Sequence, residues 1–209
     1  MCLSRADDLL TEFAEVVENI YGAYLDATHG FKNMAELITK CQSQIQQSLG
    51  IAPSQADKLP MHYGDSPPEE PGSVVQHTAS QGEVKARNAP DGHNPHLMAN
   101  MCIVALYQYW EDHYRKEIQK SLGLRPKQKI RMPIFGDLKN LRNSIIHHRS
   151  VAKPEVAKNT VITSFAAGDA IEIDAAGFYT IIEEVRKAIE ELGRALQVGG
   201  IDAFVSKDS

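Results

Sequence analysis

The chain has 209 residues, of which 43% are hydrophobic and 23% charged, and its formal net charge is -5. This composition is typical of a globular protein with enough apolar residues for one sizeable core. No segment reaches the roughly 18 apolar residues of a membrane helix and the first residues lack a signal-peptide layout, so we expect a cytoplasmic protein without membrane contact. Three widely spaced cysteines exclude a disulfide scaffold, and the mild acidity argues against a nonspecific nucleic-acid coat protein.

Two helices are predicted in the first 50 residues. Apolar residues recur at helical spacing from 6 to 27. After Gly30, Asn33 stands at an N-cap position with Glu36 three residues later, which is the pattern of a capping box, and a second apolar stripe follows from 34 to 49. We therefore expect one helix before Gly30 and a second one after Asn33.

The segment 51–95 differs in composition from the rest of the chain. It holds seven of the ten prolines, together with several glycines, and has few apolar residues to bury. Such a composition predicts a long disordered or loosely packed insertion. We draw no domain boundary there, because neither flank has enough helices for its own core, and residues 1–200 are expected to form a single helical domain.

Three further helices are predicted in the second half of the chain. Asn94 and Pro95 offer a cap and a first residue for a helix to about 122, another helix covers about 134–148, and Asp174 caps a last one. A short β-hairpin, 160–165 paired with 170–173, is expected before the last helix, and a flexible tail over 201–209 after it. The fold class predicted is all-α, a five-helix bundle with this hairpin and the loose insertion.

Positive charge is concentrated in one window, 125–153. It contains eight Lys or Arg against one acid, Asp137, and therefore carries +7, which leaves -12 for the remainder of the chain. A basic segment in an otherwise acidic protein suits phosphate recognition, because the complementary charge lies only where a polyanion binds. A solvated surface segment remains the alternative.

The predicted helix 134–148 presents two different faces. Its core face is apolar, and a second arc carries Arg142, Asn143 and His147 around Ile146. An isoleucine surrounded by polar groups favours a contact surface, and a second copy of the chain is the simplest partner.

Arg142, four intervening residues and His147, with polar Asn143 directly after the arginine, resembles the Arg-x(4–6)-His motif of HEPN domains. The helix before it, the predicted hairpin and the last helix also resemble the layout of that family, over about residues 97–197. The first two helices would complete the bundle, and the insertion has no counterpart. The resemblance implies a metal-independent endoribonuclease without cofactor, which dimerises to form a composite cleft and is typical of toxin and antiviral-defence systems.

The residue types suit this chemistry independently of the resemblance. Cleavage of RNA through its own 2'-hydroxyl needs a group that moves protons near neutral pH, and histidine is the usual choice. It also needs fixed positive charge on the phosphate, which arginine supplies. Five helical residues separate Arg142 from His147 by about 7.5 Å along the axis. We therefore expect one chain to be unable to bring both onto one phosphate, so that a homodimer builds the site.

The predicted catalytic residues are Arg142, His147 and Asn143, and the predicted substrate-binding residues are Lys139 and Arg149. His148 is the alternative catalytic histidine, but its place nearer the core arc favours a structural role. The expected partners are RNA, a second copy of the chain, and an antitoxin or regulatory protein. The alternative function is a non-catalytic HEPN-like module that binds RNA, a nucleotide or a protein. No nucleotide-binding glycine loop, dinucleotide fingerprint or hydrolase elbow is present, and the histidines of the insertion are interpreted as loop composition rather than metal ligands.

Overall fold

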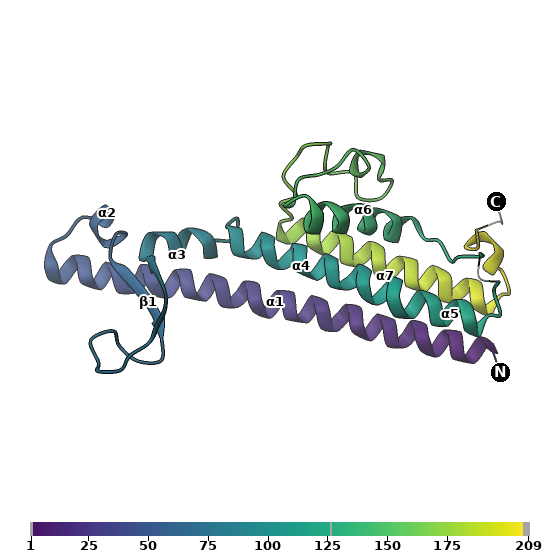
Figure 1. Cartoon of the computed structure of the whole chain (residues 1–209), viewed down its shortest axis with the longest axis horizontal. Coiled ribbons are helices and arrows are strands. Elements are labelled where there is room, and N and C mark those ends of the chain that lie inside the picture. The colour runs from purple at the N-terminus through teal and green to yellow at the C-terminus, as the bar shows by residue number, and fades with distance from the viewer. Residues whose placement is uncertain (1, 126, 207–209) are drawn as a thin grey trace. The chain divides into compact units, whose positions relative to one another are not determined.

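The computed structural model describes residues 2–125 and 127–206, and it is largely helical (Figure 1). Its contacts divide the chain into two compact units. One comprises residues up to 25 together with those from 97 onward, and the other comprises residues 26–96. The prediction of a largely α-helical fold is confirmed. Among the described residues no helix is both long and apolar enough to cross a membrane.

A single helix, α1 (Cys2–Leu49), takes the place of the two predicted at the start of the chain. The expected break near Gly30 is wrong, since this glycine keeps helical backbone and an isolated helical glycine costs only about 1 kcal/mol relative to alanine. The capping-box pattern therefore lies in a helix interior. There Glu36 forms an i,i+4 ion pair with Lys32 at 3.8 Å instead of capping a terminus.

The predicted helix over 95–122 is confirmed as three consecutive elements, α4 (His93–Tyr109), a π-helical turn η1 (Trp110–Tyr114) and α5 (Arg115–Ser121). The wider turn buries both of its end residues. Trp110 stacks on Phe135 with ring centroids 4.3 Å apart, and Tyr114 packs on Phe13 at 4.9 Å. The π-helical turn thus lies in the aromatic centre of the first unit.

The last two predicted helices are also confirmed, as α6 (Pro133–His147) and α7 (Ala175–Gln197). Pro133 occupies the first turn of α6, where its missing N–H would have no helical partner. Asp174 caps α7 as expected, because its Oδ1 accepts a hydrogen bond from the Gly177 amide at 2.7 Å. Apolar side chains from the first half of α1 and from α4, η1, α5, α6 and α7 form one continuous core.

The β-hairpin predicted for 160–173 is wrong. In that segment the only paired position is an isolated bridge between Ala170 and Val151, and the amides of residues 160–162 all donate to one carboxylate oxygen of Asp137. The distances are 3.0, 2.6 and 2.9 Å, respectively. A buried carboxylate on α6 therefore takes the donors that a strand ladder would have used.

Residues 26–96 form the second unit, so the prediction of a loose insertion over 51–95 is wrong. After α1 come the short helix α2 (Pro53–Ala56), an antiparallel pair of β1 (Pro60–Gly64) and β2 (Val75–Ser80), and helix α3 (Gln81–Asn88). Pro53 begins a helix and Pro60 begins a strand, positions at which proline loses no backbone hydrogen bond. These two prolines therefore mark element boundaries.

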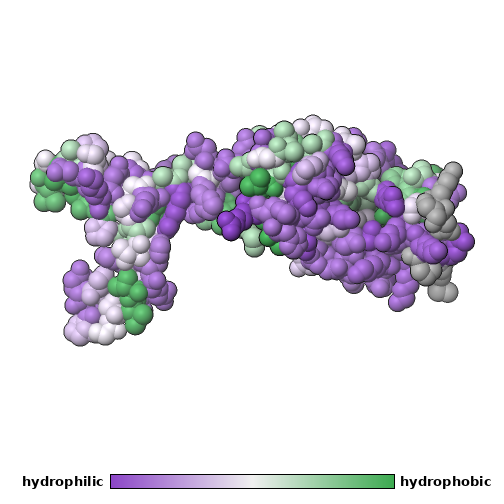
Figure 2. All heavy atoms as spheres, turned by 45° about the horizontal axis from the view of Figure 1, so that its top comes forward, coloured by the Kyte–Doolittle hydropathy of each residue, from purple (hydrophilic) through white to green (hydrophobic). Residues whose placement is uncertain are grey.

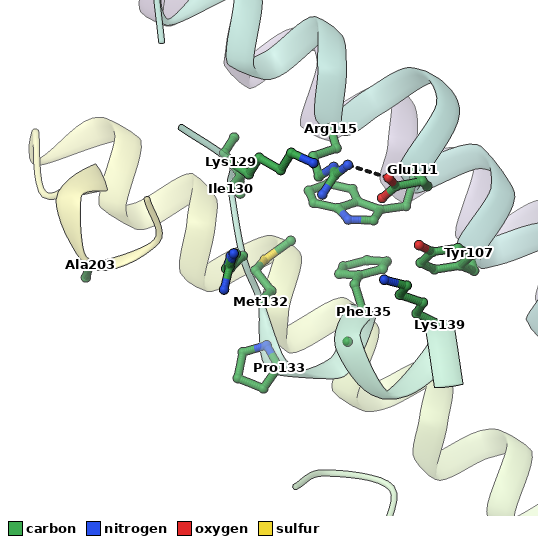
Figure 3. Close-up of a pocket in the computed structure, with 13 residues that line it drawn as sticks. Tyr107, Glu111, Arg115, Lys129, Ile130, Met132, Pro133, Phe135, Lys139 and Ala203 are labelled. Carbon is green, nitrogen blue, oxygen red and sulfur yellow. Dashed lines mark hydrogen bonds and ion pairs between the residues drawn. The ribbon is translucent and has the colours of Figure 1, made fainter. Parts of the chain in front are cut away.

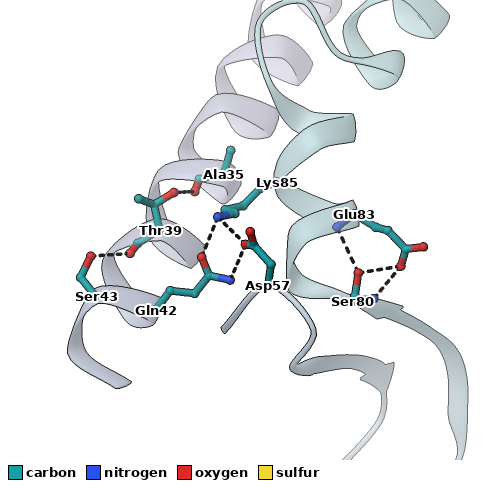
Figure 4. Close-up of polar contacts among 8 residues, drawn as sticks. All are labelled: Ala35, Thr39, Gln42, Ser43, Asp57, Ser80, Glu83 and Lys85. Carbon is teal, nitrogen blue, oxygen red and sulfur yellow. Dashed lines mark hydrogen bonds and ion pairs between the residues drawn. The ribbon is translucent and has the colours of Figure 1, made fainter. Parts of the chain in front are cut away.

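Polar contacts hold the second unit together (Figure 4). The Lys85 ammonium lies 2.7 Å from Asp57 Oδ1 and donates to Gln42 Oε1 at 2.7 Å, while Gln42 Nε2 donates to Asp57 at 3.1 Å. Ser80 and Glu83 form a reciprocal capping box at the start of α3. These contacts join α1, α3 and the residue that follows α2.

The end of the chain is paired where a flexible tail over 201–209 was expected, so that prediction is wrong for 201–206. A short helix η3 (Ile201–Ala203) precedes an antiparallel bridge between Val205 and Ile130, and the Arg131 amide donates to the Phe204 carbonyl at 2.8 Å. Ile130 is buried, which secures the contact. Residues 207–209 lie outside the described part of the chain.

Candidate functional site

The C-terminal half of α6 carries the predicted catalytic residues. Leu138 and Leu141 are fully buried and fix one face of the helix in the core, while Arg142 and Asn143 are half-buried and His147 is exposed. The amphipathic pattern therefore places these side chains at the core boundary and in solvent, as predicted.

Arg142 contacts both of its predicted partners within one chain. Its Nη1 atom lies 3.2 Å from Nε2 of His147 and donates to Oδ1 of Asn143, also at 3.2 Å. The long arginine side chain spans the turn between the two residues, so one chain already brings them into contact. The expectation that two chains are needed to bring both onto one phosphate stays a prediction. Since a guanidinium can only donate, Nε2 of His147 must present its lone pair in this arrangement.

His148, the alternative catalytic histidine, is exposed, so the core-facing structural role expected for it is wrong. It follows the last residue of α6 with φ -130, and its amide donates to the Ser144 carbonyl at 3.0 Å. The helix has already begun to unwind there, which turns the side chain away from the core arc that an uninterrupted helix would give. No described contact joins His148 to Arg142.

Two consecutive residues after α6 have left-handed backbone, Arg149 with φ 55 and Ser150 with φ 60. Each costs of order 1 kcal/mol in a residue other than glycine. Ser150 is held in place because its Oγ accepts from Asn100 at 3.3 Å and its carbonyl accepts from the Ile171 amide at 2.7 Å. This tight turn after α6, which we call the exit turn, leaves the Arg149 side chain exposed.

Lys139, one turn before Arg142, lines a cavity of about 640 Å³ between η1, α5, the start of α6 and the segment 129–132 (Figure 3). In Figure 3 the Lys139 side chain extends toward Phe135 and Tyr107. The lining contains four basic side chains and one acid, Glu111, beside an apolar wall. The basic side chains are Arg115, Lys129, Arg131 and Lys139.

Glu111 of η1 is already paired with Arg115, the first residue of α5, in an i,i+4 ion pair. The Arg115 side chain is only 14% exposed, and its Nε hydrogen has no acceptor among the described residues. No described ion pair involves the other three basic residues of the cavity. The cavity therefore carries uncompensated positive charge.

Tyr107 connects this cavity with the Arg142–His147 pair. It lines the cavity, and burial, followed by the negative charge of Glu111, raises the pKa of its hydroxyl. The charges of Arg115 and Arg142 act in the opposite direction. Both arginines are thus close enough to influence one phenol.

The structure brings Arg142, Asn143 and His147 together, whereas Lys139 belongs to the cavity and Arg149 to the exit turn. Ile146, around which the sequence places these groups, is 45% exposed. On the face shown in Figure 2, hydrophilic side chains cover most of the first unit, and hydrophobic side chains occur in small groups.

Sequence reasoning missed the cavity, although the charge excess of 125–153 marked part of it. Lys129, Arg131 and Lys139 lie in that window, but Arg115 and Tyr107 come from a helix that precedes it. The two segments meet where Trp110 of η1 stacks on Phe135 of α6.

Among the described residues there is no group of three or more His, Cys, Asp or Glu side chains arranged to hold a metal ion. Comparison of the chain with protein-family models, with curated proteins and with solved structures finds no match.

Proposed function

We propose that the protein is a HEPN-like, metal-independent endoribonuclease that cleaves RNA through attack of its 2'-hydroxyl. The observation that supports this most directly is the contact of 3.2 Å between Arg142 Nη1 and His147 Nε2 at the exposed end of α6. A permanent positive charge in contact with a proton-transferring group suits action on one phosphate.

In this proposal a phosphate oxygen of the RNA takes the Nη1 donor of Arg142. The Nε2 atom of His147 is thereby released from its hydrogen bond and accepts the proton of the 2'-hydroxyl. The 2'-oxygen then attacks the adjacent phosphorus, the bond to the 5'-oxygen breaks, and the products are a 2',3'-cyclic phosphate and a 5'-hydroxyl. Asn143 orients the guanidinium through its Oδ1 atom.

A second copy of the chain would complete the reaction. The leaving 5'-oxygen needs a proton while His147 is taking one up, so one histidine cannot serve both roles in the same step. Two chains packed through the exposed Ile146 would supply two histidines. Such an enzyme would act as a toxin or defence component in the cytoplasm, restrained by an antitoxin or another regulatory protein.

The test is cleavage of end-labelled RNA by the purified protein in the presence of EDTA. We expect cyclic phosphate ends, and a loss of at least about a hundredfold in rate for both Arg142→Ala and His147→Ala. Lys158→Ala removes an exposed charge elsewhere in the same unit and serves as the control. Normal cleavage by both variants, or cleavage abolished by EDTA, would refute the proposal.

His148→Ala distinguishes the two histidines, because it should cleave normally if His147 is the active one. Expression in cells offers a second readout, in which growth inhibition relieved by His147→Ala supports a toxin. RNA binding without cleavage in the parent protein would instead support the non-catalytic module, for which the uncompensated charge of the cavity is the favouring observation.

A further inference from the structure

We infer that Asn100 of α4 is a positioning residue for the proposed site, where it keeps His147 in contact with Arg142. It does so by holding the exit turn, which consists of Arg149 and Ser150. The effect on cleavage rests on the proposed function, whereas the effect on the His147 ring does not. Asn100 is only 5% exposed and lies 50 positions before Ser150, so no local pattern in the sequence marks their contact.

The exit turn has a conformation that its own residues disfavour. Both residues have left-handed backbone, with φ of 55 and 60, and neither is a glycine. Such strain persists only where surrounding contacts impose it, and it is found most often at functional sites. Asn100 adds a second cost, because its Oδ1 atom is buried and has no hydrogen-bond donor among the described residues. Stability alone does not account for two unfavourable features at one turn.

The Asn100 side chain joins this turn to the interior of the first unit. Its Nδ2 atom donates to Ser150 Oγ at 3.3 Å and to the Ile171 carbonyl at 3.0 Å. The Ile171 amide in turn donates to the Ser150 carbonyl at 2.7 Å. One buried side-chain amide therefore fixes both Ser150 and the segment that pairs with it.

The exit turn in turn caps the end of α6. The Ser150 amide donates to the carbonyls of Ser144 and Ile145, at 3.2 and 3.4 Å, respectively. The final carbonyls of a helix lack partners within it, so the last turn frays unless a cap satisfies them. His147 lies in that last turn, whereas buried leucines anchor the preceding turns of α6 in the core. Loss of the cap should therefore move His147 relative to Arg142.

The tautomer of the neutral His147 ring reports this contact directly. While Arg142 donates to Nε2, the ring proton must lie on Nδ1, and the nitrogen chemical shifts of the ring distinguish the two tautomers. Arg142→Ala supplies the reference spectrum of a ring without the contact. We expect Asn100→Ala to shift the tautomer most of the way toward that reference. Ser150→Ala removes only an exposed-side hydroxyl contact, and it should shift the tautomer less but in the same direction.

Asn159→Ala is the matched control. Asn159 is also a buried asparagine of the first unit with one unsatisfied amide atom, and it contacts α6 through Asn140 rather than through the exit turn. Its loss should leave the His147 tautomer unchanged. In RNA cleavage, Asn100→Ala should lower kcat about tenfold or more with little change in KM, because it misplaces a reacting group. Asn159→Ala should cleave like the parent protein.

The inference is overturned if the parent protein already has the His147 tautomer of Arg142→Ala, or if neither Asn100→Ala nor Ser150→Ala changes it. An equal change in Asn159→Ala, or a normal kcat in Asn100→Ala despite a changed tautomer, would also overturn it. A parent protein that does not cleave RNA would refute the proposed function, but the ring spectra would still decide whether Asn100 positions His147.

Discussion

Arg186 of α7 binds both carboxylate oxygens of Glu18 on α1, with Nε 2.7 Å from Oε1 and Nη2 2.6 Å from Oε2. The two residues are 168 positions apart, so this pair joins α1 to α7. The guanidinium also lies over the Tyr21 ring, with its central carbon 5.3 Å from the ring centroid.

Arg186→Lys should destabilise the protein by up to about 1 kcal/mol at neutral pH, since an ammonium cannot form the paired contact and both side chains are partly exposed. The hydrogen bond from Arg186 lowers the pKa of Glu18 in the folded state. The pair therefore contributes stability above the unfolded-state pKa of Glu18, and this contribution is lost as the pH falls through the folded-state value. Urea unfolding of both proteins should show a difference at neutral pH that shrinks in acid. A difference that grows in acid would contradict the assignment.

Asp137→Ala should be among the more destabilising single changes in the chain, by about 3 kcal/mol or more, because it leaves three amide donors without their acceptor. Asp137→Asn retains one oxygen at the same place and should cost less. Denaturant midpoints of the two variants measure this order. Equal midpoints would show that the segment 160–162 finds other partners.

Arg149→Gly should stabilise the protein by about 1 kcal/mol, because glycine adopts the φ of 55 without steric cost. Under the proposed function it should also raise the KM for RNA, since it removes a charge near the motif. Ser150→Gly is the matched control, which relieves a φ of 60 but leaves the charge intact. An unchanged KM in Arg149→Gly would exclude this arginine as a phosphate contact.

Lys85→Met should raise the pKa of Asp57, because the hydrogen bond from Lys85 is the main cause that lowers it and the one from Gln42 is the second. NMR titration of the Asp57 carboxyl in the folded protein measures the change. Lys58→Met removes an exposed neighbouring charge and should have a much smaller effect. Equal shifts in the two variants would mean that general charge, rather than the Lys85 contact, sets the pKa.

Helical periodicity in the sequence predicted most elements of the first unit, because their apolar stripes face a single core. It failed where local patterns compete with tertiary contacts. The capping pattern of Asn33 and Glu36 is satisfied equally well by an ion pair inside a helix, and the apolar run 160–165 suits a strand until Asp137 takes its amides. The composition of 51–95 suggested disorder because a few polar contacts, such as that of Lys85 with Asp57, leave little trace in hydropathy.

The candidate site was predictable in part. The spacing of Arg142, Asn143 and His147 placed them on one face, but helix geometry alone underestimated the reach of an arginine side chain. The cavity could not be predicted, because Arg115, Arg131 and Ala203 meet only after the helices pack and the end of the chain pairs with Ile130.

The π-helical turn at Trp110–Tyr114 sets the rotation of α5 about the common axis of α4, η1 and α5. A chain one residue shorter at this turn would restore ordinary helical hydrogen bonding but turn α5 by about 100° about its axis. Ile118 would then leave the core, and Arg115 would leave the cavity together with its unsatisfied Nε. One extra residue in the π-helical turn therefore determines whether α5 packs into the core. It also determines whether the cavity has its buried guanidinium.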